Sequence, residues 1–372
     1  MKASRTHWSI DLIGGCFGIA IALGLVRFDF GIIGNLMADA QWIDVEDIGT
    51  LAAINMFGYL TGCIQQATVK SRATSIRYVQ IAMITIIASI VLEGRSTNLP
   101  SQSVLRLLCG WGAAHVVSGL PTLALERVPQ RWRRKATGLI MSGGGIGSLL
   151  GAVGIGFFAP TSAPSAWNVL ATLTVVLSLP TLALLRQRKQ LPTPASETLT
   201  DSTNQTISNF NKRKINQLIL IIILGFALMQ IGQIPVILYE PLIAVNKIGL
   251  TPMMASNIDS LFGVGLIIGG VIPSIVPSKL TTSLFLAVIA AVGLAGMILF
   301  GISNHLITLS ISIFLIGVWD MMTGTLTLDR LGQLCNEDTQ RRAWSTATTI
   351  GAMGFIAFSS TTSQLAQHNV NL

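Results

Sequence analysis

Two arginines lie inside long apolar stretches of the sequence, where a charged side chain is costly. Arg27 occurs within LGLVRFDFGIIG and Arg106 within SVLRLLCGWGAA. An ionised group in hydrocarbon costs about 2.5–3.5 kcal/mol even on insertion scales, so it faces a partner or a wet cavity. A guanidinium can bind both oxygens of a carboxylate, so Arg27 is predicted to bind an anionic substrate group or a coupling carboxylate, with a structural ion pair as the alternative. Asp29, about 200° around the same helix, is expected to face a neighbouring helix or the outer interface.

Titratable side chains in other apolar stretches are candidate proton carriers. His115 lies nine residues after Arg106, on roughly the opposite helix face, and is either a proton relay or a hydrogen-bonded packing residue. Arg106 lies near one end of its stretch, where it can snorkel toward the interface. Asp320 is the best acidic candidate in the second half of the chain, because a buried carboxylate can hold a proton. Asp259 is a weaker one.

Neutral polar side chains add hydrogen-bonding groups at helical spacing. Gln230 and Gln233 are three residues apart and share a face, and Pro235 just beyond them is expected to break the helix and free carbonyl groups for a cavity. This combination indicates a ligand-facing pair, and interhelical hydrogen bonding is the alternative. Asn55 and Tyr59 lie four residues apart on the second apolar stretch and offer neutral hydrogen bonds to a substrate.

The elements that must position these residues are membrane-spanning helices. About 20 apolar residues cross the roughly 30 Å of hydrocarbon in a bilayer. On that measure the sequence predicts eleven spans, near residues 11–36, 48–67, 77–93, 103–125, 136–159, 166–185, 215–239, 251–276, 281–302, 304–327 and 342–363. The predicted fold class is therefore an all-α membrane protein.

Basic residues alternate between the gaps that separate these spans. Of the 24 Lys and Arg residues, 20 lie in every second gap, Arg95 and Lys247 lie in the opposite gaps, and two lie inside spans. Basic residues near the ends of spans stay on the cytoplasmic side of a membrane. With Lys2 and Arg5 ahead of the first span, the N-terminus is predicted to be cytoplasmic, in a bacterial inner membrane.

Composition excludes several other classes of protein. The chain is 51% hydrophobic and 11% charged, too few charges to solvate a soluble protein of 372 residues. Its formal charge of +8 is spread over short loops, so no nucleic-acid partner is expected. Cys16, Cys63, Cys109 and Cys335 are far apart, which predicts neither a disulfide framework nor a metal site. We expect no cofactor, a lipid bilayer as the surroundings, and a monomer.

A long hydrophilic stretch divides the chain into two sets of spans. Residues 186–214 are polar in the middle and basic at both ends, as in a disordered cytoplasmic linker. The predicted domains are a six-helix bundle over 1–185 and a five-helix bundle over 215–372. Two related halves with a substrate held between them near the midplane are typical of transporters. An offset of about 206 residues sets the first span beside the seventh and places Arg27 opposite Gln233.

Several motifs resemble one branch of the major facilitator superfamily. The runs LGLVRFDFGIIGNLM and GTLAAINMFGYLTGC resemble the first two spans of YbfB/YjiJ-like transporters, which carry Gly-x-x-Arg-Phe and Asn-x-x-Gly-Tyr motifs. The matching residues here are Gly24, Arg27, Phe28, Asn55, Gly58 and Tyr59. The fourth span, with Arg106, Gly110, Gly112, Ala113 and Ala114, resembles the superfamily motif that is associated with proton coupling. The fifth carries SGGGIGSLLG, in which Gly147 and Gly151 are spaced for close helix packing.

The resemblance implies two helical bundles and transport by alternating access. We expect a secondary transporter for a small polar or anionic organic solute, coupled to protons, with Arg27, Asn55, Tyr59, Arg106, His115, Gln230, Gln233 and Asp320 as the substrate-binding or coupling residues. After residue 363 only a short polar segment remains, so we expect this sequence to lack the twelfth span of the superfamily. A truncated or non-transporting membrane protein, either a sensor or a decayed transporter, is the alternative. An enzyme is not expected, because neither a zinc-protease signature nor a nucleophile elbow is present.

Overall fold

The computed structural model describes residues 5–69, 71–190, 209–275, 282–334, 343–344 and 346–359, and within these ranges the chain is helical without strands. Nine helical segments in this part of the chain are long and apolar enough to cross a membrane. Helix α3 (Val45–Ala67) and a shorter apolar helix, Thr346–Ser359, lie at the two remaining predicted spans. Eleven helices therefore follow the predicted order, and the all-α fold class is confirmed.

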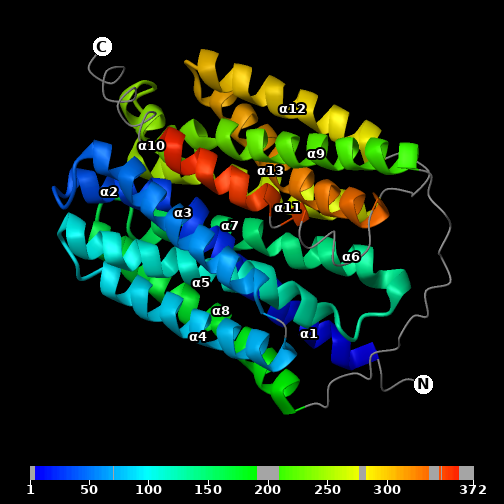
Figure 1. Ribbon diagram of the computed structural model, residues 1–372. Coiled ribbons are helices and arrows are strands. Elements are labelled where there is room, and N and C mark those ends of the chain that lie inside the picture. Colours follow the sequence, from blue (N-terminus) through cyan, green and yellow to red (C-terminus); the bar gives the residue numbers. More distant parts are fainter. Residues whose placement is uncertain are drawn as a thin grey trace.

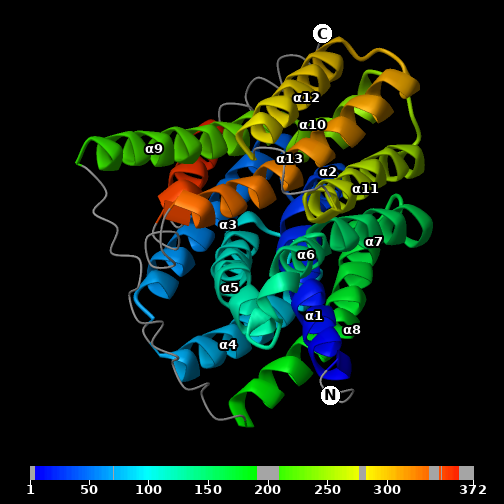
Figure 2. The ribbon, with the colours of Figure 1, turned by 90° about the vertical axis from the view of Figure 1, so that its right-hand side faces the viewer.

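The helices of residues 5–190 lie below those of residues 209–359 in the view of Figure 1, and Figure 2 shows the same arrangement from the side. The first set includes α4 (Arg72–Glu93), α5 (Leu99–Leu125) and α8 (Ala163–Gln190). The second set includes α11 (Pro252–Ile275), α12 (Thr282–Ile302) and α13 (Leu306–Leu334). Residues 191–208 of the predicted linker lie outside the described residues.

The first span is interrupted at the level of Arg27. It consists of α1 (Arg5–Ile19), a π-helix η1 (Ala20–Phe28) and α2 (Phe30–Asp39). The backbone N–H of Asp29 donates to the carbonyl of Gly24 at 3.1 Å, a five-residue step that widens the helix. The segment between α1 and α2 therefore turns its side chains differently from an ideal α-helix.

The fifth and seventh spans are also interrupted. Helices α6 (Gln130–Met141) and α7 (Gly143–Phe158) meet at Ser142. Helices α9 (Asn209–Gly232) and α10 (Ile234–Asn246) meet at Gln233, two residues before the proline in the first turn of α10. Proline fits the first turn of a helix because its missing N–H has no partner there. The break that the sequence predicts near Pro235 is present, and it places Gln233 at the junction.

Glycines bring the fifth span into contact with the first. A Cβ atom on Gly143 would overlap the carbonyl of Cys16, and one on Gly147 would overlap the carbonyl of Ala20. Side chains larger than hydrogen would force the two backbones apart, so the close packing predicted for the glycine-rich motif is found. Gly151 lies against the side chain of Asp29 at the next turn.

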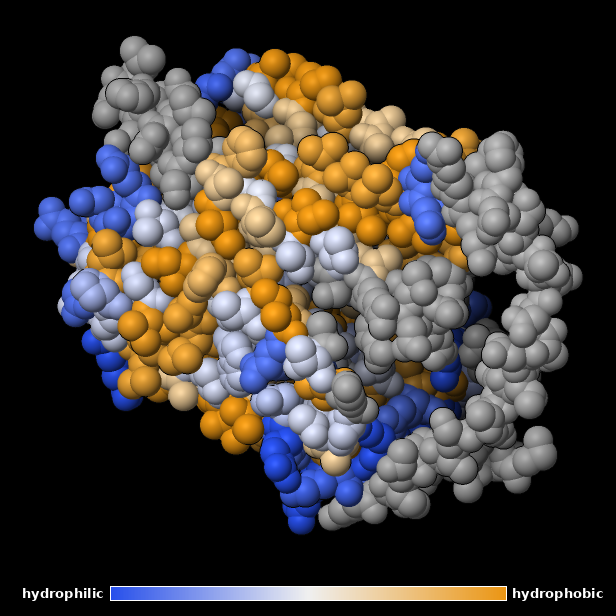
Figure 3. All heavy atoms as spheres, in the orientation of Figure 1, coloured by the Kyte–Doolittle hydropathy of each residue, from blue (hydrophilic) through white to orange (hydrophobic). Residues whose placement is uncertain are grey.

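Large apolar side chains cover the outward faces of the helices. Phe158 is 80% exposed, Ile275 73% and Leu228 67%, which would be unfavourable in water. Figure 3 shows such residues over much of one face of the molecule, with hydrophilic residues at its ends. This distribution suits a protein whose sides contact lipid.

Ion pairs join several helix ends of the first set. The Arg188 guanidinium donates to Asp11 at 2.6 Å, and Arg72 forms two hydrogen bonds with Glu126 at 2.8 and 3.0 Å. Arg188 belongs to the predicted linker, yet α8 continues through it to Gln190 and the side chain is 2% exposed. The buried carboxylate of Asp11 stabilises this last part of α8, within the stretch that the sequence assigns to the linker.

Candidate functional site

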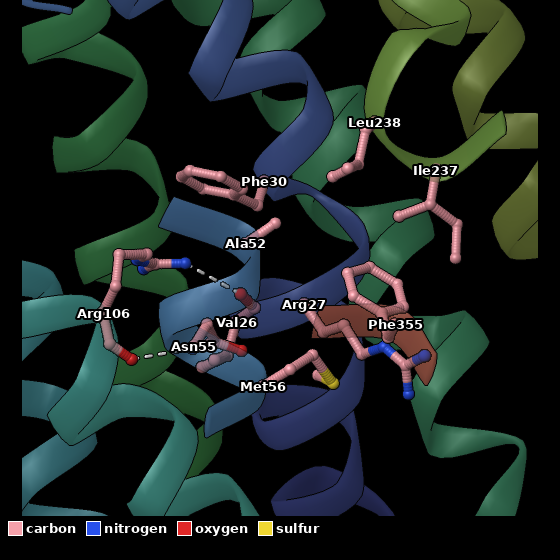
Figure 4. Close-up of a pocket in the computed structure, with 10 residues that line it drawn as sticks. All are labelled: Val26, Arg27, Phe30, Ala52, Asn55, Met56, Arg106, Ile237, Leu238 and Phe355. Atoms are coloured by element: carbon pink, nitrogen blue, oxygen red, sulfur yellow. Dashed lines mark hydrogen bonds between the residues drawn. The ribbon is translucent and has the colours of Figure 1, made fainter. Parts of the chain in front are cut away.

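The π-helix η1 positions Arg27 between the two sets of helices. Arg27 lies in its last turn and is half-buried, whereas all its other residues are buried. Helix η1 packs against α7, through the glycine contacts, and against α5. Figure 4 shows the Arg27 side chain beside Phe355 and directed away from Arg106. π-Helical turns are rare and often occur at functional sites.

The Arg27 guanidinium contacts an amide and two aromatic rings. Its Nη2 donates to Oε1 of Gln230 in α9 at 3.2 Å. Its central carbon lies 5.5 Å from the ring centre of Phe28 and 5.6 Å from that of Phe355. Nε is buried and has no hydrogen-bond partner within the described part of the chain. The positive charge of Arg27 therefore faces a neutral amide and two aromatic rings, and the guanidinium can still donate hydrogen bonds to an anion.

The seventh and tenth spans complete a chain of polar groups that begins at Arg27. In one of its two orientations the Gln233 amide donates to Oε1 of Gln230. The other end of the Gln233 amide faces Asp320 in α13; with its nitrogen turned that way, it donates to Oδ1 and Oδ2 at 3.2 and 3.0 Å. Gln233 is completely buried and Asp320 is 7% exposed. Arg27 and Asp320 also interact electrostatically, so four of the predicted site residues form one continuous group.

Asn55 and Tyr59 lie one turn apart on α3 and have different partners. Tyr59 is close enough to Arg27 for an electrostatic interaction, and it also interacts with Cys63 on the same helix. The amide of Asn55 donates to the backbone carbonyl of Arg106 at 2.9 Å. Tyr59 therefore belongs with Arg27, whereas the Asn55 side chain is occupied in joining α3 to α5.

A cavity of about 10 Å³ lies beside Arg27, where the two sets of helices meet. Its lining residues, drawn in Figure 4, come from η1, α2, α3, α5, α10 and the helix Thr346–Ser359. A cavity of this size holds about one water molecule. The structure therefore describes a closed arrangement around Arg27, and an organic solute needs the helices to separate.

Arg106 lies in a different environment and is fully engaged. Its Nε donates to Glu93 at 2.6 Å, its Nη2 donates to the second oxygen of Glu93, and its Nη1 donates to the carbonyl of Val26 at 3.0 Å. The guanidinium packs over the rings of Phe30 and Trp167 at 4.7 and 5.2 Å. Arg106 is 1% exposed, so the snorkelling that the sequence allows is replaced by a buried ion pair. Through these contacts Arg106 joins α5 to α4 and to η1.

His115 lies away from Arg27, among the helices of the first set. Its Nδ1 contacts Gln66 at 2.8 Å and its Nε2 contacts Gln65 at 3.1 Å. The indole N–H of Trp111 donates to the same Gln65 oxygen at 2.8 Å, so that oxygen accepts and Nε2 of His115 must carry a proton. With Tyr78 stacked on its ring, His115 has the contacts of a packing residue.

Buried carboxylates form a second group that the sequence reading did not bring together. Asp29 and Glu240 are completely buried, Asp259 is 7% exposed, and Asp259 interacts electrostatically with both of the others. Asp29 faces the fifth span, as expected for a residue on the opposite side from Arg27. Glu240 was missed because it follows the predicted end of the seventh span. Among the described residues, no group of three His, Cys, Asp or Glu could hold a metal ion.

The comparisons with known proteins agree with this architecture. The family model described as "Uncharacterised MFS-type transporter YbfB" matches residues 19–370. The chain belongs to this family. The predicted resemblance to the YbfB-like branch of the major facilitator superfamily is thereby confirmed, and the chain is a multi-pass membrane protein of a transporter family. A comparison with curated protein sequences gives no significant match.

A solved structure supports the fold of this YbfB-type protein. The crystal structure of a D-xylose-proton symporter aligns with a TM-score of 0.65 and 16% sequence identity, over 95% of this chain and 88% of the symporter chain. At this identity the likeness concerns the fold alone.

Proposed function

We propose that this protein is a secondary active transporter that moves a small polar or anionic organic solute by alternating access, coupled to protons. The observation that carries the proposal is the state of Arg27. Its guanidinium is half-buried at the meeting of the two sets of helices, and its direct hydrogen bond goes to the neutral side chain of Gln230. A fixed cation without a directly bonded carboxylate in a low-dielectric site attracts an anionic group.

The remaining site residues have distinct proposed roles. Gln230 and Tyr59 surround the guanidinium and offer neutral hydrogen bonds to the same solute. Asp320 is the proposed carrier of the coupling proton, because it is buried, lies within electrostatic reach of Arg27 and is bonded directly to no cation among the residues that the structure describes. Arg106 holds the first span against the fourth, Asn55 joins the second span to the fourth, and His115 packs within the first set.

Alternating access requires the two sets of helices to move as units about the site. We propose residues 1–185 and 215–372 as these units, joined by the linker 186–214. Gly145 and Gly263 face each other across the contact between α7 and α11 with no side chain between them. Such a smooth contact suits sliding or rocking. A monomer in a bacterial inner membrane with a cytoplasmic N-terminus completes the proposal.

Transport by proteoliposomes tests the function directly. Candidate anions are first found by thermal-shift screening of the purified protein, since a ligand that binds the folded form raises its apparent stability. Each is then supplied to liposomes with and without an imposed proton gradient. We expect uptake that the gradient accelerates and that Arg27→Gln abolishes. Absence of uptake for every ligand that stabilises the protein would instead support a non-transporting membrane protein.

A further inference from the structure

The polar chain from Arg27 to Asp320 contains two amide groups, and each amide can turn end over end. A glutamine amide has an oxygen that accepts hydrogen bonds and a nitrogen that donates them, in nearly the same shape. Gln230 contacts Arg27 and Gln233 through one atom, and Gln233 contacts Gln230 and Asp320 through opposite ends. The orientation of one amide therefore constrains the orientation of the next.

When Asp320 carries a proton, one arrangement of the two amides pairs every donor with an acceptor between Arg27 and Asp320. The Asp320 hydroxyl donates to the Gln233 oxygen, and the Gln233 nitrogen donates to the Gln230 oxygen. Arg27 donates to that same Gln230 oxygen, as its 3.2 Å contact requires. A carbonyl oxygen has two lone pairs and accepts both bonds.

When Asp320 is ionised, its carboxylate only accepts hydrogen bonds. Gln233 then turns its nitrogen to the carboxylate, where it lies 3.2 and 3.0 Å from the two oxygens. Its oxygen now faces Gln230 and needs a donor, so Gln230 must turn its own nitrogen toward Gln233. Arg27 then faces an N–H group instead of an oxygen and loses its hydrogen bond, because two donors cannot pair.

We infer that Gln230 and Gln233 form an amide relay through which protonation of Asp320 orients Arg27 for an anionic substrate. This inference rests on the proposed function and deepens it. Protonation removes the negative charge of Asp320, leaves the Arg27 charge uncompensated, and restores the hydrogen bond that holds the guanidinium. An anion and a proton therefore bind together, so that one proton accompanies one negative charge in symport.

The charged groups around Asp320 are consistent with this coupling. Arg27 is the charged group that faces Asp320 from the first span, and the Tyr59 hydroxyl faces Arg27 from α3. Helix α12, which packs on α13, has no charged residue, and the carboxylates of α10 and α11, Glu240 and Asp259, interact with each other. The relay thus connects Asp320 to its principal electrostatic partner.

Nuclear magnetic resonance of the full-length protein in lipid nanodiscs tests the relay, with ¹⁵N-labelled glutamine side chains as the probe. Signals of the two amides are assigned from their loss in Gln230→Met and Gln233→Met. In the unsubstituted protein we expect both signals to shift with one common pH midpoint. Asp320→Asn should abolish both shifts, and Gln233→Met should abolish the shift of Gln230. Gln80→Met, on α4, is the matched control and should leave both shifts unchanged.

Independent behaviour of the amides would overturn the relay. This includes a Gln230 signal that does not titrate in the unsubstituted protein, or one that still titrates in Gln233→Met. If that variant does not fold, Gln233→Asn keeps the amide but shortens its reach, and should likewise abolish the Gln230 shift. The experiment requires no transport, so a relay in a protein that fails to transport would overturn only the proposed function, and uncoupled amides in an active transporter would overturn only the relay.

Discussion

The two arginines within the spans have different surroundings, although the sequence presents them alike. Arg106 is 1% exposed and donates to both oxygens of Glu93 and to a backbone carbonyl. Arg27 is half-buried and donates to a neutral amide from the other set of helices. An arginine that is paired with a carboxylate stabilises the fold and has its charge compensated. An arginine that faces a neutral amide at an interface can bind a further anion.

Removal of the Glu93 carboxylate should produce the largest effect. Glu93→Gln leaves the Arg106 guanidinium buried without a counter-charge, which costs about 3–5 kcal/mol of folding stability. Thermal unfolding of the purified protein in detergent would measure the loss. The double variant Glu93→Gln with Arg106→Gln removes both charges and should recover much of it. Unfolding of Glu93→Gln at the unsubstituted temperature would mean that the pair is not structural.

Removal of the Arg27 charge should affect binding and not folding. Arg27→Gln should weaken binding of an anionic ligand by about 1.5–3 kcal/mol, or roughly 10- to 150-fold, because a charge-assisted hydrogen bond is lost. Calorimetric titration would measure the change, and the unfolding temperature should stay close to that of the unsubstituted protein. A severe loss of stability would place Arg27 in the same class as Arg106.

A glycine substitution tests how the fifth span supports Arg27. Gly147→Ala places a methyl group against the carbonyl of Ala20 in η1 and should cost about 1–3 kcal/mol through overpacking. Gly225→Ala is the matched control, since no atom of the described residues lies within 4 Å of the added atom and alanine favours the helix. Stability measurements on both variants would check the difference. Equal effects would show that the contact between η1 and α7 does not position Arg27.

Replacement of His115 should have the smallest effect. His115→Asn removes hydrogen bonds to Gln65 and Gln66 at a cost of about 1 kcal/mol, without touching the Arg27 group. The pH profile of transport in proteoliposomes should keep its midpoint. A displaced midpoint would make His115 a part of the proton path.

The sequence predicts the helices well because a span depends on local composition. It also places Gln233 at a helix break, because Pro235 acts on its own helix. The pairing of Arg106 with Glu93 was missed, although both lie at facing ends of two consecutive spans, where a short connection brings them together. The π-helix at Arg27 has no local sequence signal, since it depends on packing against the glycines of the fifth span.

The most direct test of the central claim compares ligand stabilisation in two variants. The protein, Arg27→Gln and the control Gln80→Met would be heated with the same organic anions and with matched neutral analogues. We predict that at least one anion raises the unfolding temperature of the protein and of Gln80→Met, and that Arg27→Gln loses this rise. An anion that stabilises Arg27→Gln as much as the unsubstituted protein would contradict the claim that Arg27 is its binding group.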